Sequence, residues 1–278
     1  MSEMTENRIK MKTINNNLIL FEYDLFNFNC LLIKTKKRLF VVDTYMGPDS
    51  MSEVKAVFDE LSQGRDCFVI NTHSHFDHIW GNCLFENTPL ISHVLCRERI
   101  IDKAQTELDS YRVSNPEWVK GDVKIVYPDM TFSDKLIFED EDCTVVLEHF
   151  PGHSPDSIII WLEPYHICLA GDSLEDPFPL AHEYYDLSGA AVLLKSLRNL
   201  HSRKPKAIYP AHGRRYDGEL LIDNISYIAN LLESLGNESE ENALLENINN
   251  NICEISQRYL QYHARNVSAL KEHIHETI

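Results

Sequence analysis

Apolar and polar residues follow one another in blocks along the first part of the chain. Three β-branched and aromatic runs, at residues 17–23, 28–35 and 38–44, are separated by short polar breaks and predict strands. Residues 50–63 carry apolar side chains at helical spacing, which predicts an amphipathic helix. The apolar run at 67–72 is typical of a strand buried on both faces.

The remainder of the first 235 residues shows the same kinds of pattern. Strands are expected near 123–126, 134–138, 144–150, 157–163, 166–172 and 206–210, and helices near 94–108, 188–201 and 219–235. Each half of the chain therefore runs through strands and then helices. This order predicts an α/β fold in which two sheets pack face to face with helices outside, a four-layer αββα sandwich.

The last part of the chain follows an acidic break that begins at Asn237. We expect one domain over residues 1–235 and a helical appendage over 236–278. Apolar side chains recur there at roughly helical spacing, at Leu244, Leu245, Ile248, Ile252, Ile255, Tyr259, Leu260 and Leu270. A stripe of this kind has to be buried, either as a structural cap, at the substrate entrance or in a homodimer. We expect a solvated helix face for His263, His273 and His275.

The charge and composition of the chain limit which classes of partner we expect. The 278 residues include 26 basic and 43 acidic side chains, for a net charge of −17. Such a charge disfavours nucleic acid and anionic membranes and favours a small-molecule substrate. The sequence shows neither a membrane-spanning run nor a secretory signal, so we expect a cytoplasmic protein. Its seven cysteines form no CxxC pair and are expected to be free thiols.

Ligand-type side chains concentrate directly after the buried strand at 67–72. His73, His75, Asp77 and His78 fall within one stretch of six residues. Imidazole and carboxylate groups are the ligands that zinc accepts where no thiolate is supplied. The alternation of these residues in a tight loop can direct donors to one centre, and His78 to a second.

Three further segments place a ligand-type residue just after a predicted strand and next to a glycine. These are His153 in PGHS, Asp172 in LAGDS and His212 in YPAHG. Together with the loop at 73–78, they make seven ligands, which are too many for one tetrahedral ion. The set predicts two metal ions with one bridging carboxylate.

The combination of HSHFDH with the later PGHS, AGD and PAHG resembles the metallo-β-lactamase superfamily over residues 15–235, and FVVDT at 40–44 resembles an early motif of that family. The resemblance implies that His73, His75 and His153 hold the first metal. It implies that Asp77, His78 and His212 hold the second and that Asp172 bridges the two. β-Lactamases of the family commonly have Cys at the bridging position, so Asp172 favours the thioesterase, lactonase and phosphodiesterase branches.

The function implied is a metal-dependent hydrolase. A hydroxide bridging two divalent ions, expected to be Zn²⁺ with iron or manganese as alternatives, would attack an ester, thioester, lactone or phosphoester bond. Asp77 and Asp172 are the expected catalytic residues. Two other functions stay open: a mono-iron oxidoreductase that resembles the persulfide dioxygenases, and a non-catalytic metal-binding sensor.

Several other polar residues near the motifs invite either a structural or a functional interpretation. Asp43 can orient a ligand histidine, whereas His93 is expected to be structural. The side chains that can meet a substrate are His182, Tyr184, Tyr185, Arg214 and Arg215.

Overall fold

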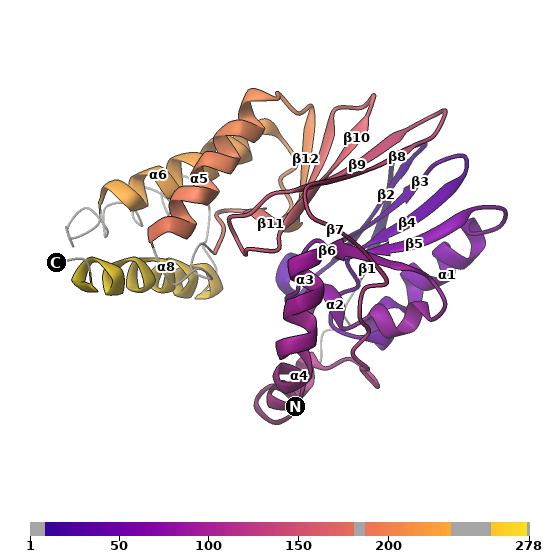
Figure 1. Cartoon of the computed structure of the whole chain (residues 1–278), viewed down its shortest axis with the longest axis horizontal. Helices are drawn as coiled ribbons and strands as arrows, with labels where there is room; N and C mark the ends of the chain where they lie inside the picture. Colours follow the sequence, from indigo (N-terminus) through magenta and orange to yellow (C-terminus); the bar gives the residue numbers. More distant parts are fainter. Residues whose placement is uncertain (1–8, 181–186, 235–256, 277–278) are drawn as a thin grey trace. The chain divides into compact units, whose positions relative to one another are not determined.

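Two β-sheets and their helices make up the protein in a computed structural model that describes residues 9–180, 187–234 and 257–276 (Figure 1). Strands β1 to β7 form a seven-stranded sheet in sequence order. The second sheet has five strands in the order β12, β11, β10, β9 and β8. The predicted α/β class with two sheets is confirmed.

The chain divides into two compact units. The first contains residues 1–149 and 160–164, and the second contains residues 150–159 and 165–278. The predicted domain boundary after residue 235 lies outside the described residues. It therefore stays a prediction.

The first unit is built on the seven-stranded sheet. Its strands are β1 (Ile9–Asn15), β2 (Leu18–Tyr23), β3 (Asn29–Lys34), β4 (Arg38–Val42), β5 (Asp66–Ile70), β6 (Leu90–His93) and β7 (Met130–Phe132). The first four pair antiparallel, and β4 to β7 pair parallel. Helix α1 (Ser52–Leu61) connects β4 to β5, as its amphipathic pattern predicted. The unit also contains β8 (Lys135–Glu139) and β9 (Thr144–His149).

The helix predicted at 94–108 is present and continues to Ser114, with an irregular middle. Helix α3 (Val94–Arg99) passes through a π-helical turn (Ile100–Ala104) into α4 (Gln105–Ser114). Side chains spaced four residues apart along it pack into one buried cluster with Trp80; they are Cys96, Ile100, Ala104 and Leu108.

The structure corrects the prediction of a strand at 123–126. Val123 is buried in the cluster around Trp80, and its carbonyl accepts a hydrogen bond from Arg112 at 3.1 Å. The apolar pattern there reflects packing against helices and not pairing in a sheet. Strands β1, β6 and β7 were not predicted. β1 and β7 are polar or short and largely exposed, and β6 is a buried strand of only four residues.

The second unit carries the remaining predicted elements. Strand β10 (Ile158–Glu163) spans the division between the units, and β11 (Ile167–Glu175) pairs parallel with β12 (Ala207–His212). The helices are α5 (Leu187–Ser202), α6 (Gly218–Glu233) and α8 (Gln257–Glu276). The predictions of helices near 188–201 and 219–235 are confirmed.

The buried face of α8 differs from the predicted apolar stripe. Tyr259 is buried as expected, but Leu260 is 38% exposed. His263, expected to be solvated, is only 7% exposed and contacts Tyr227. The stripe positions from Leu244 to Ile255 lie outside the described residues, and the structure does not describe the side chains of Leu270, His273 and His275.

Two further predictions concern thiols and membranes. Six of the seven cysteines lie in the described part of the chain, and all six are free thiols, as expected. Among the described helices, none combines the length and the apolar character that crossing a membrane requires.

Gly81 permits a close approach that a side chain would block. A Cβ at this position would collide with the carbonyl of Thr44, the residue after Asp43. We expect Gly81→Ala to lower the free energy of unfolding by about 1–3 kcal/mol, because the backbone has to move apart. Gly218→Ala is the matched control, since a Cβ there meets nothing within 4 Å. Chemical denaturation should show a loss for the first variant alone; equal stabilities would contradict the packing argument.

Candidate metal centre

The histidine motif begins where strand β5 ends in the first unit. Because β4 and β5 are parallel neighbours, their carboxyl ends lie at the same edge of the sheet. Asp43 follows β4 and His73 lies three residues beyond β5. A short helix, α2 (Phe76–Ile79), starts inside the motif that sequence predicted as a loop. This turn brings His78 back toward the sheet edge.

The carboxylate of Asp43 connects the two strand ends. It accepts hydrogen bonds from the backbone N–H and the hydroxyl of Thr72, both at 2.8 Å, and its Oδ2 lies 2.9 Å from Nδ1 of His78. Asp43 is 2% exposed and has a φ of +59°, a strained value for a residue other than glycine. The contact orients the His78 ring, as the sequence predicted for Asp43 and a histidine of the motif.

Two buried asparagines, Asn71 and Asn82, form hydrogen bonds that hold the same loop. Asn71 donates to the carbonyl of His78 at 2.9 Å, and the backbone N–H of Thr44 donates to the same carbonyl at 3.0 Å. Asn82 donates to Asn71 at 2.8 Å and accepts from the hydroxyl of Thr44 at 2.7 Å. These hydrogen bonds satisfy buried polar groups and fix the backbone of the motif.

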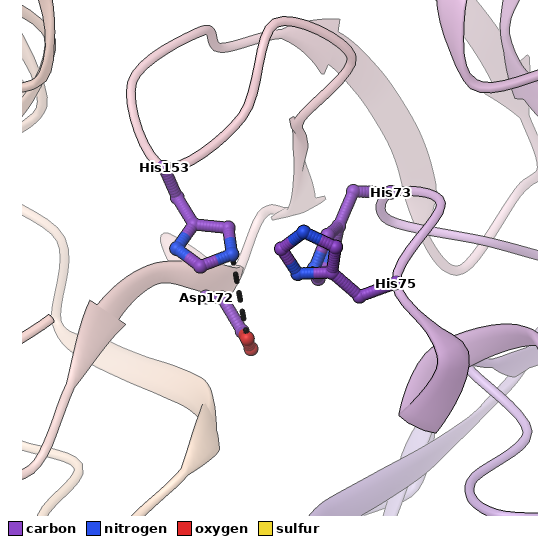
Figure 2. A group of neighbouring side chains, drawn as sticks. All are labelled: His73, His75, His153 and Asp172. Atoms are coloured by element: carbon purple, nitrogen blue, oxygen red, sulfur yellow. Dashed lines mark hydrogen bonds and ion pairs between the residues drawn. The ribbon is translucent and has the colours of Figure 1, made fainter. Parts of the chain in front are cut away.

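The imidazoles of His73 and His75 point toward one place. Nε2 of His73 lies 2.8 Å from Nδ1 of His75 (Figure 2). Nδ1 of His73 contacts the hydroxyl of Thr72 at 3.1 Å, so the neighbouring hydroxyl fixes the far side of this ring. Asp77 and His78 lie together as well, with Oδ1 of Asp77 3.8 Å from Nε2 of His78. All four motif residues therefore gather in the first unit.

In the second unit, His153 lies in the turn that follows β9, as predicted. Gly152 lets this turn approach helix α5, because a Cβ there would meet Leu193 at 2.6 Å. Ser196 of α5 donates to the carbonyl of Pro151 at 3.0 Å. Nδ1 of His153 contacts the carbonyl oxygen of Leu180 at 3.0 Å. A carbonyl at this distance fixes the ring so that Nε2 faces the other way.

Asp172 lies between two histidines of the second unit. Its Oδ2 is 3.7 Å from Nε2 of His153, the dashed line in Figure 2, and its Oδ1 is 3.6 Å from Nε2 of His212. Ligands of one tetrahedral zinc ion are separated by about 3.4 Å, given metal–ligand distances of about 2.1 Å. Each oxygen of Asp172 thus has the spacing to share an ion with a different histidine.

The structure moves two of these residues relative to the sequence prediction. Asp172 does not follow its strand but lies inside β11, and His212 is the last residue of β12. The register of the two strands shifts between Gly171 and Glu175, and Gly171 has a φ of +53°. The irregular stretch rotates the strand at Asp172, so a ligand can be presented without ending the strand.

Glu175 is a buried carboxyl that the sequence did not single out. Burial, together with the nearby charge of Asp172, raises the pKa of Glu175 to about 7, while His212 and Arg258 act in the opposite direction. The hydroxyl of Tyr259 donates to it at 3.3 Å. No sequence signal distinguished this residue, because nothing in the motif around Asp172 predicts contact with a helix that lies 84 residues further along the chain.

The structure places three of the other candidate residues, His93, Arg214 and Arg215. The guanidinium of Arg214 donates to the carbonyl of Gly213 at 2.8 Å. His93 caps α3, contacts the carbonyl of Ser133 at 3.0 Å and stacks on His149, a structural role as predicted. Arg215 pairs with Asp223 at 2.8 Å. His182, Tyr184 and Tyr185 lie outside the described residues.

Thr72 and Arg99 are two further contributors that sequence reasoning missed. Thr72 contacts Asp43, His73 and, at 3.5 Å, His78. Arg99 donates from Nε to the hydroxyl of Ser74 at 3.0 Å. Thr72 could have been predicted, because its hydroxyl comes directly before the first histidine of the motif. Arg99 could not, because it lies 25 residues from Ser74 in the chain.

Comparison with known proteins identifies the family. The profile of the Metallo-beta-lactamase superfamily matches residues 24–212, which is more than half of the chain. The chain belongs to this superfamily, as the motif predicted.

Two relatives are described as different enzymes. The chain is 28% identical to an N-acyl homoserine lactonase of Bacillus cereus over 52% of its own length and 55% of the relative. It is 21% identical to a linear primary-alkylsulfatase of Pseudomonas sp. over 70% of its length and 43% of the relative. The chain therefore spans about half the length of these relatives.

The fold is shared with solved structures. A metallo-β-lactamase from Pontibacter korlensis aligns with a TM-score of 0.62, at 17% identity, over 80% of this chain and 100% of that one. The two proteins share the α/β fold with two sheets.

Replacing Asp43 tests whether the buried carboxylate supports metal binding. We expect Asp43→Asn to weaken zinc affinity about 10- to 100-fold, because His78 loses the charged group that orients it. The control is Asp66→Asn, which changes an exposed carboxylate on β5. Competition with a chromophoric chelator measures both variants. An unchanged affinity in Asp43→Asn would remove Asp43 from the metal centre.

Proposed function

We propose that the chain is a hydrolase with two metal ions that cleaves an ester or lactone bond in a small molecule. The proposal depends most on Asp172, whose two carboxylate oxygens face His153 and His212 at 3.7 and 3.6 Å. A carboxylate that offers one oxygen to each of two histidines is suited to bridge two ions.

The donor set fits zinc in kind and number. In the proposal the first ion takes His73, His75 and His153, the second takes Asp77, His78 and His212, and Asp172 bridges them. Membership of the superfamily and the presence of every ligand of its motif support this division.

The contacts around the ligands also fit a metal. Ligand histidines usually hold their second ring nitrogen on a carboxylate, a carbonyl or a hydroxyl. His78 has the carboxylate of Asp43, His153 has the carbonyl of Leu180, and His73 has the hydroxyl of Thr72. These partners leave the opposite nitrogen of each ring directed toward the proposed ion.

The proposed chemistry assigns a role to each carboxylate. When bound, two zinc ions would lower the pKa of a water molecule to about 7 and polarise the carbonyl of the substrate. Asp77 would orient the attacking water and accept its proton at a carboxylate oxygen. Asp172 would hold the metal-binding groups at a fixed separation, and Asp43 and Leu180 would keep His78 and His153 from rotating.

Two observations favour a neutral, partly apolar substrate. Phe76, inside the motif, stacks on Trp118 at 5.9 Å between ring centroids, and Trp118 meets the edge of Phe26 at 5.2 Å. All three rings are half-buried, so they offer an aromatic surface beside the motif of the first unit. The net charge of −17 disfavours polyanions. The lactonase relative supports a cyclic ester within this class.

The first prediction from this function is the metal content. We expect about two zinc ions per chain after reconstitution, because seven ligands supply two ions. Elemental analysis of the dialysed protein measures the ratio, with a His73→Ala and His78→Ala double variant as the control for adventitious binding. One tightly held iron and no second ion would favour the oxidoreductase alternative instead.

The second prediction concerns Asp172. We expect Asp172→Ala to lose one metal ion and to lower kcat by at least about 100-fold, because the bridge and its charge disappear. The control is Glu233→Ala, which removes an exposed carboxylate on α6. The assay compares acyl lactones, aryl esters, thioesters and phosphodiesters. Near-normal turnover by Asp172→Ala on the best substrate would refute the assignment, and preference for a phosphodiester would refute the substrate class.

A further inference from the structure

Helix α8 buries a polar face in the second unit. Tyr259, His263 and Asn266 are 5%, 7% and 1% exposed, and their spacing places them on one side of the helix. Buried polar groups require hydrogen-bond partners. The partners of these three side chains therefore show what the helix holds in place.

Asn266 reaches the segment that follows strand β11. Its side-chain amide donates to the carbonyl of Pro179 at 3.1 Å and to the hydroxyl of Tyr227 at 3.0 Å. The same hydroxyl lies 3.2 Å from Nδ1 of His263. One backbone carbonyl of the segment is thus held directly by the C-terminal helix.

The next carbonyl along the chain holds a proposed metal ligand. The oxygen of Leu180 lies 3.0 Å from Nδ1 of His153. Pro179 and Leu180 are consecutive residues, so a shift of the Pro179 carbonyl moves the acceptor of His153 with it. The connection from α8 to His153 passes through the two peptide units that meet at Leu180.

Residues 175–177, at the start of the segment that leads to Leu180, are held by side chains of α6 and α8. Tyr259 and Arg258 approach the carboxylate of Glu175 at 3.3 and 3.8 Å. Asn224 of α6 donates to the carbonyls of Glu175 and Pro177 at 2.9 and 3.1 Å. Only Asn266, among these side chains, bonds the carbonyl adjacent to Leu180.

Packing completes the contact. Phe178 is 1% exposed, stacks on Tyr227 at 4.2 Å between centroids and meets Tyr259 at 5.5 Å. Residues 175–180 are therefore enclosed between α6 and α8, and their backbone has little freedom to move when both helices are in place.

We propose that Asn266 is a positioning residue for the metal centre, which orients the imidazole of His153 through the carbonyls of Pro179 and Leu180. The inference rests on the proposed metal centre. It assigns a role to a residue 54 positions beyond the region that matches the family profile, which ends at residue 212. The acceptor of a ligand histidine's second nitrogen sets the ring's orientation and its affinity for the metal.

The test measures zinc affinity of the full chain by competition with a chromophoric chelator. We expect Asn266→Ala to weaken one of the two zinc ions about tenfold. Two controls should stay within about twofold of the unaltered chain. Gln261→Ala removes an exposed amide from the same helix. Tyr227→Phe removes the hydroxyl that accepts from Asn266 and does not touch the bond from Asn266 to Pro179.

A double-mutant cycle separates positioning from general loosening. In a His153→Ala background, Asn266→Ala should leave the affinity of the second ion unchanged, because the ring that Asn266 positions is gone. Equal losses in both backgrounds, or an equal loss in Tyr227→Phe, would overturn the proposal. Asn266→Leu, which keeps the volume and lacks the donor, replaces the alanine variant if thermal unfolding shows that variant to be unfolded.

The outcome also distinguishes this inference from the proposed function. If the unaltered chain binds no zinc, the metal centre and the inference both fail. If the unaltered chain binds two ions and Asn266→Ala binds them equally tightly, only the role of Asn266 is wrong.

Discussion

The buried carboxylate of Asp43 has to be compensated, and its compensation determines where the first unit holds its histidines. An unpaired buried charge costs several kcal/mol, on the order of the total stability of many domains. Two hydrogen bonds from Thr72 and the contact with His78 meet this requirement. They tie the end of β4 to the motif after β5, so the positions of the histidines follow from the sheet itself.

In the second unit, a backbone group and not a charged side chain orients the histidine. His153 is oriented by a carbonyl, and Asp172 is presented by an irregular stretch within β11. A carbonyl can orient a ring only if its own segment is fixed. The helices α6 and α8 provide this, since Asn224 binds the carbonyls of Glu175 and Pro177 and Asn266 binds that of Pro179. The positions of His153 and Asp172 therefore depend on residues that lie far from any sequence motif.

The sequence was sufficient for the fold class, for most strands and helices, and for the contact between Asp43 and a histidine, because these depend on local periodicity and on dense motifs. It failed where a pattern has two physical explanations. Val123 is apolar because it packs on helices, and β1 is a polar strand at a sheet edge. Glu175, Arg99 and Asn266 were missed since their partners lie 25 or more residues away in the chain.

The π-helical turn at Ile100–Ala104 determines which deletions in the surrounding helix keep its side chains on the buried face. On an ideal α-helix, side chains four residues apart drift by about 40° at each step, so the four positions from Cys96 to Leu108 would spiral off their cluster. The wider turn rotates less per residue and returns the later positions to the same face. Removing one residue there would shorten the spacing from Ile100 to Ala104 to three residues, which suits a regular helix, so the later positions would keep their face. A one-residue deletion is therefore compatible with the buried cluster inside this turn, whereas the same deletion in a regular part of α4 would turn the residues after it by about 100°.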